Sequence, residues 1–158
     1  MLFRSVGDTL DAPRRGAGIF PTNKADLLTD PNGAALFAVA RGALEDVGQY
    51  VAIFHKIAVA NPDKFFHAFG IFQYDIQFAK GDPQFFLQKK WYSFDACLAK
   101  ALGEMKEALA GTYGANKASL TDKEMAYVAI AYNKGSAKLT GSLKQGFKDD
   151  SEIGRAHV

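Results

Sequence analysis

Residues 125–132 read Met-Ala-Tyr-Val-Ala-Ile-Ala-Tyr, an uninterrupted apolar run that begins directly after Glu124. Thr121 and Glu124 have the spacing of a capping box, in which each side chain bonds the backbone amide of the other residue, so a helix is predicted to start here. A helix that is apolar on nearly every side is predicted to be central and buried. Residues 133–135 (Asn-Lys-Gly) are predicted to end it. The run therefore favours a mainly helical domain.

Two further helical stretches are predicted upstream of this run. In residues 34–60 apolar side chains recur every three or four positions, the pattern of an amphipathic helix. A turn at residues 30–33 is predicted to start this stretch, Gly48 to divide it in two, and residues 61–63 to end it. Its predicted buried face consists of Phe37, Ala40, Leu44, Val47, Val51, Phe54 and Ala58. The second stretch is predicted to be closed by Gly111 and to bury Phe94, Leu98, Ala101, Leu102, Met105 and Leu109.

The segment between these helices is dense in aromatic residues. Residues 65–78 are predicted to form short extended pieces and turns around Gly70, a hairpin region, and Asp82 is predicted to cap a helix with Pro83 at its first position. We expect its aromatic side chains to lie mostly in the core, with one or two free to stack on a sugar: Phe65, Phe66, Phe69, Phe72, Phe78, Phe85 and Phe86. The predicted fold class is mainly α, of the α+β kind.

Length and composition exclude several classes of protein. The 158 residues, 48% of them hydrophobic, suffice for one globular domain, and we expect a monomer. Nineteen basic residues against 17 acidic ones give a net charge of +2, so no strong basic field favours nucleic acid as a partner. Charged residues interrupt every apolar run well short of a membrane span.

The two ends of the chain match a foreign nucleotide sequence. Residues 152–158 back-translate to the start of a common short-read sequencing adapter, and residues 1–5 back-translate to its reverse complement. We therefore expect both segments to be encoded by adapter. The intervening chain is predicted to comprise an irregular leader over residues 6–33 and a domain over residues 34–151 that is truncated at its C-terminus.

Several chemistries lack the residues that they need. His55 and His67 have no neighbouring ligand pattern, so no metal site is predicted. Cys97 lies between Ala96 and Leu98 on a helical pattern, where a small buried thiol is expected rather than a nucleophile. The sequence contains no nucleotide-binding or serine-hydrolase motif, and no cofactor is predicted.

Two motifs combine polar and aromatic residues in a way that points to chemistry. The first is residues 69–75, Phe-Gly-Ile-Phe-Gln-Tyr-Asp, and the second is residues 131–135, Ala-Tyr-Asn-Lys-Gly. The first resembles the Gly-hydrophobic-Met-Gln motif of goose-type lysozymes and lytic transglycosylases, and the second resembles the Ala-Tyr-Asn-x-Gly motif of the same superfamily. Their order and the helices between them are also similar, over roughly residues 34–135. The resemblance implies a lysozyme-like fold and a glycosidase that cleaves peptidoglycan between N-acetylmuramic acid and N-acetylglucosamine.

The resemblance also implies site residues. In this family the catalytic acid is a glutamate at the end of a helix upstream of the first motif, and Glu45 is the only glutamate before Glu104. A glutamic acid kept neutral by an apolar pocket can protonate the leaving oxygen of a glycosidic bond. Asp75 is the implied second carboxylate, which would activate water in an inverting hydrolase, whereas a transglycosylase needs no such base. The implied substrate-binding residues are Gly70, Gln73, Tyr132 and Asn133, with Tyr132 also able to orient the acid.

Alternatives remain open for each of these residues. Glu45 can be a solvated helix glutamate, since the apolar period continues past it and places it in mid-helix. Gln73 and Asp75 can cap local turns, and Tyr132 and Asn133 can be a core tyrosine and a helix cap. The alternative functions are a non-catalytic glycan-binding or structural domain on the same fold and a chitosanase-like hydrolase. A peptidoglycan substrate implies a periplasmic or extracellular location.

Overall fold

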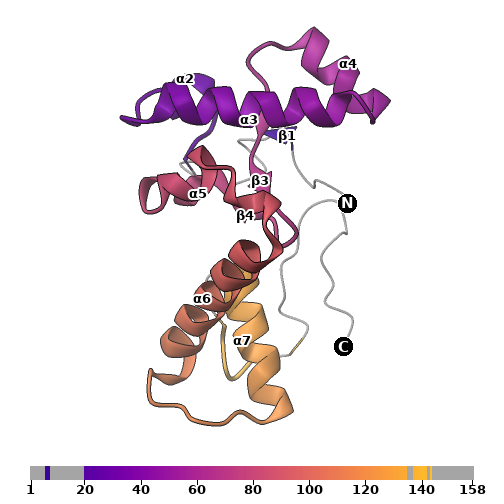
Figure 1. Ribbon diagram of the computed structural model, residues 1–158. Coiled ribbons are helices and arrows are strands. Elements are labelled where there is room, and N and C mark those ends of the chain that lie inside the picture. Colours follow the sequence, from indigo (N-terminus) through magenta and orange to yellow (C-terminus); the bar gives the residue numbers. More distant parts are fainter. Residues whose placement is uncertain (1–5, 8–19, 135–136, 142, 144–158) are drawn as a thin grey trace. The chain divides into compact units, whose positions relative to one another are not determined.

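A computed structural model describes residues 6–7, 20–134, 137–141 and 143 of the chain (Figure 1). The chain divides into two compact units, one up to Leu98 and one from Ala99 onward. The boundary lies inside a helix that spans Phe94–Tyr113. The predicted adapter segments, Gly135 and most of the polar stretch after residue 141 lie outside the described residues. None of the described helices is both long and apolar enough to cross a bilayer.

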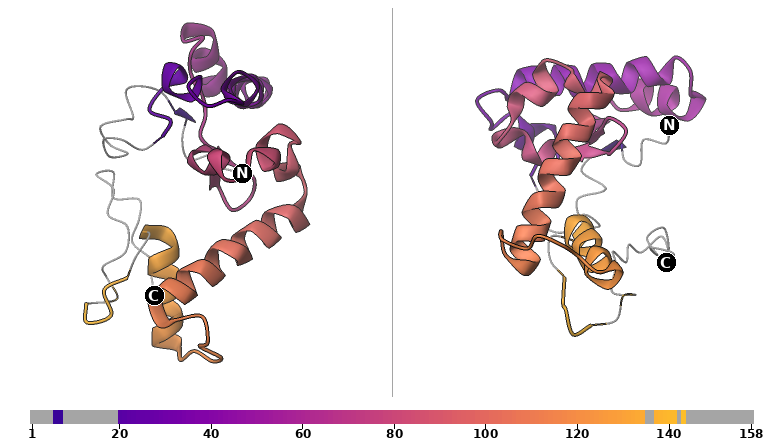
Figure 2. Two further views of the ribbon diagram at one scale, coloured as in Figure 1. Left: turned by 90° about the vertical axis from the view of Figure 1, so that its left-hand side faces the viewer. Right: turned by 60° about the horizontal axis from the view of Figure 1, so that its bottom comes forward.

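Helices dominate the first unit (Figures 1 and 2). They are α2 (Lys24–Leu27), α3 (Gly33–Gly48), α4 (Ala52–Ala60) and α5 (Pro83–Leu87), with 3-10 turns η1 (Ile76–Lys80) and η2 (Lys90–Tyr92). The mainly helical fold class is thereby confirmed. The predicted break at Gly48 is also confirmed: a Cβ at Gly48 would lie 3.1 Å from the Cα of His55, so the missing side chain lets α3 and α4 approach each other. The stretch predicted to be irregular contains α2.

Short antiparallel strands form two pairs in this unit. Strand β1 (Val6–Gly7) pairs with β2 (Phe65–Phe66), and β3 (Ala68–Phe69) pairs with β4 (Tyr74–Asp75). In the second pair Ala68 faces Asp75 and Phe69 faces Tyr74, so residues 70–73 form the turn of a hairpin. The predicted hairpin region around residues 65–78 is confirmed.

The core of the first unit joins α3 to the aromatic segment. Leu36, Ala40 and Leu44 form the fully buried face of α3, which packs against β2, α4 and α5. Five of the seven phenylalanines predicted for the core are buried, namely Phe65, Phe66, Phe69, Phe85 and Phe86. Phe72 and Phe78 are exposed, which agrees with the expectation that one or two of these rings are free. Val51 of the predicted helix face is exposed, contrary to the prediction.

The second unit contains most of α6 (Phe94–Tyr113) and all of α7 (Asp122–Lys134). The prediction that Gly111 closes α6 is wrong. The helix continues to Tyr113, and Gly114, at φ +88°, follows it and donates from its amide to the carbonyl of Ala110. Only a residue at positive φ turns the backbone out of the helix in this way, and glycine adopts that φ without steric cost.

Burial in α6 and α7 is less complete than predicted. Tyr127, Val128, Ile130 and Ala131 of α7 are buried, but Met125 and Ala129 are exposed, so this helix is not buried on every side. On α6 Ala101 is buried, whereas three of the residues predicted to accompany it are exposed, namely Phe94, Leu102 and Met105.

The predicted capping box at the start of α7 is confirmed. The amide of Thr121 donates to Glu124 Oε2 at 2.8 Å, and the amide of Glu124 donates to Thr121 Oγ1 at 3.4 Å. Lys117 Nζ lies 2.8 Å from Glu124 Oε1. The side-chain hydrogen bond from Lys117, followed by the bond from the Thr121 amide, lowers the pKa of Glu124 from 4.5 to about 2.

This carboxylate makes the helix start sensitive to acid. A carboxyl whose pKa is depressed on folding contributes stability above its unfolded pKa, and that stability is lost as the pH falls through the folded value. We therefore expect the thermal midpoint of the protein, followed by helical circular dichroism, to decrease as the pH falls from 4.5 to 2. Glu124→Gln keeps the shape of the capping box without the ionisation, so this part of the pH dependence should be absent in the variant. If the thermal midpoint of Glu124→Gln changed with pH as steeply as that of the wild type, other carboxyls would cause the pH dependence.

Candidate functional site

Glu45 lies in the last turn of α3, because the helix ends at Gly48. The apolar period that continues to Ala58 belongs to the separate helix α4, so of the two alternatives the structure has the break at Gly48 and not the mid-helix position of Glu45. Its neighbour Leu44 is fully buried, and the rotation of about 100° per residue turns Glu45 away from that face. The side chain of Glu45 is 55% exposed, so the carboxyl is accessible and does not lie in the apolar pocket that its proposed role suggested.

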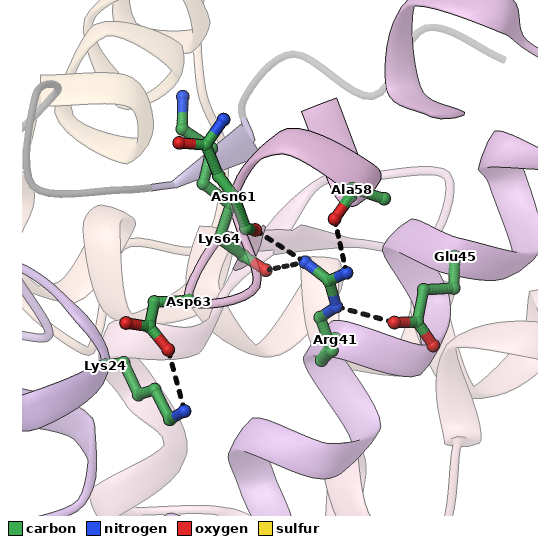
Figure 3. A network of polar contacts seen from close by, with 7 residues as sticks. All are labelled: Lys24, Arg41, Glu45, Ala58, Asn61, Asp63 and Lys64. Carbon is green, nitrogen blue, oxygen red and sulfur yellow. Dashed lines mark hydrogen bonds and ion pairs between the residues drawn. The ribbon is translucent and has the colours of Figure 1, made fainter. Parts of the chain in front are cut away.

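Arg41, one turn earlier on α3, donates a hydrogen bond to this carboxylate (Figure 3). Its Nε donates to Glu45 Oε1 at 2.7 Å, while the rest of the guanidinium bonds three backbone carbonyls at the end of α4 and in the turn that follows. These are the oxygens of Ala58, Asn61 and Lys64, at 2.6, 2.8 and 3.1 Å. The Arg41 side chain is only 15% exposed. Since the last carbonyls of a helix lack intrahelical partners, Arg41 caps α4 and supports Glu45 at the same time.

The hairpin turn places Gly70 and Gln73 together. The backbone amide and the side-chain Nε2 of Gln73 both donate to the carbonyl of Gly70, at 3.2 and 3.0 Å. Gly70 has φ +71°, and a Cβ there would lie 2.6 Å from Cys97 Sγ and 3.2 Å from Trp91 Cβ. Cys97 is buried, as expected, and its thiol donates to the carbonyl of Trp91. These contacts explain why residue 70 is glycine without reference to a substrate.

Asp75 follows the turn and caps the next element. Its Oδ1 accepts from the backbone amide of Gln77 at 2.9 Å, which makes Asp75 the N-cap of η1. Gln73 and Asp75 thus have the local structural roles that were the alternatives to substrate binding and base catalysis. Each is only partly buried, so neither contact removes the side chain from solvent.

Aromatic side chains are exposed beside this turn. Phe72, in the turn itself, is 38% exposed, and Phe94 at the start of α6 is 58% exposed. Their ring centroids are 6.3 Å apart with the planes inclined at 42°. Both residues belong to the first unit, and their rings offer apolar faces of the kind on which sugars stack.

Tyr132 and Asn133 lie at the end of α7, in the second unit. Asn133 is exposed, and its Nδ2 donates to the carbonyl of Ala129 one turn earlier. Tyr132 is partly buried, and burial, followed by the charge of Glu104 on α6, raises the pKa of its phenol. Burial and then the charge of Glu107 raise the pKa of Glu104, against an opposing effect of Lys100. Glu104 is therefore a partly buried carboxyl whose charge acts on the Tyr132 phenol.

The six predicted site residues fall into three groups. Gly70, Gln73 and Asp75 belong to the hairpin. Glu45 lies on α3 of the same unit, whereas Tyr132 and Asn133 belong to the other unit. Sequence reasoning missed Arg41 and Glu104. The spacing of four residues between Arg41 and Glu45 was a signal for an ion pair, whereas nothing in the pattern of α6 distinguishes Glu104. Within the part of the chain that the structure describes, no three His, Cys, Asp or Glu side chains gather in a metal-binding cluster.

Comparison of the chain with protein-family models, with curated proteins and with solved structures finds no match.

Proposed function

We propose that this protein is a lysozyme-like glycosidase that cleaves peptidoglycan between N-acetylmuramic acid and N-acetylglucosamine, with Glu45 as the general acid. The observation that carries the proposal is the position of Glu45 in the last turn of α3, with an exposed carboxyl, ahead of a hairpin that bears the first motif. This is where the resemblance expects the acid. A general acid must reach the glycosidic oxygen, and accessibility is the first condition for that contact.

The other site residues have supporting roles in this proposal. Gly70 shapes the hairpin turn, and Gln73 binds the sugar or its N-acetyl groups. Asp75 activates water if the reaction is hydrolysis, because one carboxylate then protonates the leaving oxygen while the other accepts a proton from water. In a lytic transglycosylase the attacking hydroxyl belongs to the sugar. The substrate implies that the protein acts in the periplasm or outside the cell.

A second candidate function is non-catalytic binding of the same glycan. Three observations favour it. The side chain of Glu45 is 55% exposed and does not lie in the apolar pocket that a general acid needs. Gln73 and Asp75 bond local backbone. Phe72 and Phe94 expose ring faces that suit stacking on sugars without any chemistry.

Incubation of the protein with purified insoluble peptidoglycan separates these candidates. Soluble fragments and co-sedimentation of the protein are measured in the same sample. The proposal expects fragments, with new reducing ends for a hydrolase or internal anhydro rings for a transglycosylase. Co-sedimentation without fragments would favour the binding function. Faster cleavage of soluble chitosan than of peptidoglycan would indicate a chitosanase-like hydrolase, and neither binding nor cleavage would contradict all of these functions.

A further inference from the structure

We propose that Arg41 is a positioning residue for Glu45: it fixes the carboxyl of the acid relative to the end of α4. This inference rests on the proposed glycosidase function, because it assigns Arg41 a role in that reaction. Figure 3 shows the arrangement, in which one guanidinium connects Glu45 to the carbonyls of Ala58, Asn61 and Lys64.

The geometry of the guanidinium makes this connection rigid. Arginine presents its N–H donors in a planar fork, so three carbonyl bonds made by Nη1 and Nη2 determine where Nε points. Nε then holds Glu45 Oε1 at 2.7 Å. With its side chain 15% exposed, Arg41 is restrained by its surroundings, whereas the 55% exposed side chain of Glu45 has little packing of its own. The position of the carboxyl therefore depends on Arg41.

The contact also leaves the acid able to donate. Arg41 bonds Oε1, and a carboxylic acid that carries its proton on Oε2 still accepts a hydrogen bond at Oε1. During the reaction the proton leaves Oε2 for the glycosidic oxygen, the bond between that oxygen and the sugar carbon breaks, and Glu45 becomes a carboxylate. The guanidinium then stabilises the negative charge that has formed beside it. The sugar carbon then bonds the oxygen of water, whose proton goes to Asp75, or the sugar's own hydroxyl, whose proton returns to Glu45. Arg41 keeps the same bonds before and after this step.

Lys24 and Asp63 supply a matched comparison in the same region. Lys24 Nζ lies 2.7 Å from Asp63 Oδ1, and this ion pair ties α2 to the turn between α4 and β2 (Figure 3). Asp63 is 71% exposed, and the pair does not include Glu45. Asp63→Asn therefore loosens the same turn without a direct effect on the acid.

Turnover of peptidoglycan by five variants tests the inference. Lysine keeps the charge of Arg41 but cannot bond Glu45 and three carbonyls together. We expect Arg41→Lys to lower kcat by about tenfold or more with KM within about twofold, since misplacement of a catalytic group affects the chemical step. Asp63→Asn should leave kcat and KM within about twofold of the wild-type values. In the Glu45→Gln background, Arg41→Lys should cause no further loss, because residues that act as a unit are not additive. Glu45→Asp, which moves the carboxyl away from Nε and touches none of the carbonyl bonds, should also lower kcat.

Results that contradict the positioning role of Arg41 differ from results that contradict the proposed function. Thermal melting of each variant establishes the temperature at which it is folded, and rates are compared below it. Three results would overturn the positioning role alone. They are a wild-type kcat in Arg41→Lys, a loss of kcat in Asp63→Asn equal to that in Arg41→Lys, and a further loss of kcat when Arg41→Lys is added to Glu45→Gln. If Arg41→Lys does not fold, a wild-type kcat in Glu45→Asp would overturn that role instead. Wild-type turnover in Glu45→Gln, or no turnover by the wild type, would overturn the proposed function and this inference with it.

Discussion

Glu45→Gln is expected to lower the rate of peptidoglycan cleavage by about 100-fold or more, because general acid catalysis contributes about 10²–10⁴-fold and an amide cannot donate the proton. Glutamine has nearly the same shape, and its side-chain oxygen can still accept from Arg41 Nε. The variant should therefore fold and sediment with insoluble peptidoglycan as the wild type does. The rate of fragment release and the bound fraction are measured on the same samples.

Two carboxyls serve as controls for this substitution. Asp46, the next residue on α3, is also exposed, and Asp46→Asn should retain the wild-type rate. Glu104→Gln removes the partly buried carboxyl near Tyr132. If turnover survives in Glu45→Gln and disappears in Glu104→Gln, the acid lies in the second unit. If the wild type and all three variants sediment with peptidoglycan and none of them releases fragments, the protein binds glycan and does not cleave it.

Features that depend on neighbours in the chain could be predicted from the sequence. The capping box of Thr121 and Glu124, the N-cap at Asp82 and the break at Gly48 each involve residues a few positions apart, and the structure has all three. The hairpin region was also predictable, because aromatic density and Gly70 are local signals. The mainly helical fold class follows from the same kind of pattern.

Features that depend on distant contacts could not be predicted. The carbonyls that orient Arg41 lie 17–23 residues away in the chain and are backbone groups, which carry no side-chain signature. The identity of an aromatic residue does not indicate whether its ring is covered, so the sequence could not show which one or two of the seven phenylalanines are exposed; they are Phe72 and Phe78. The division after Leu98 falls inside α6, where no change of composition marks a boundary.

Gly70→Ala is expected to lower the free energy of unfolding of the first unit by about 2–5 kcal/mol. A left-handed backbone conformation costs an L-residue about 1–2 kcal/mol, and Gly70 has φ +71°. Overpacking of a full core costs a further 1–3 kcal/mol, roughly, and the new Cβ would lie 2.6 Å from Cys97 Sγ. Trp91 Cβ and its carbonyl oxygen lie on the same side, at 3.2 and 3.4 Å, so the thiol has little room to move. Denaturant unfolding followed by the fluorescence of Trp91 measures the change.

Gly42→Ala is the matched control for this substitution. Gly42 lies inside α3, and apart from the neighbouring backbone of the helix itself no heavy atom lies within 4 Å of a Cβ built there. Because alanine loses less backbone entropy in a helix than glycine, this variant should gain roughly 0.5–1 kcal/mol. The two substitutions add the same methyl group with opposite expected signs. If Gly70→Ala were as stable as the wild type but bound glycan less well, the main role of Gly70 would be contact with the substrate; loss of stability assigns it to the hairpin that carries Gln73 and Asp75.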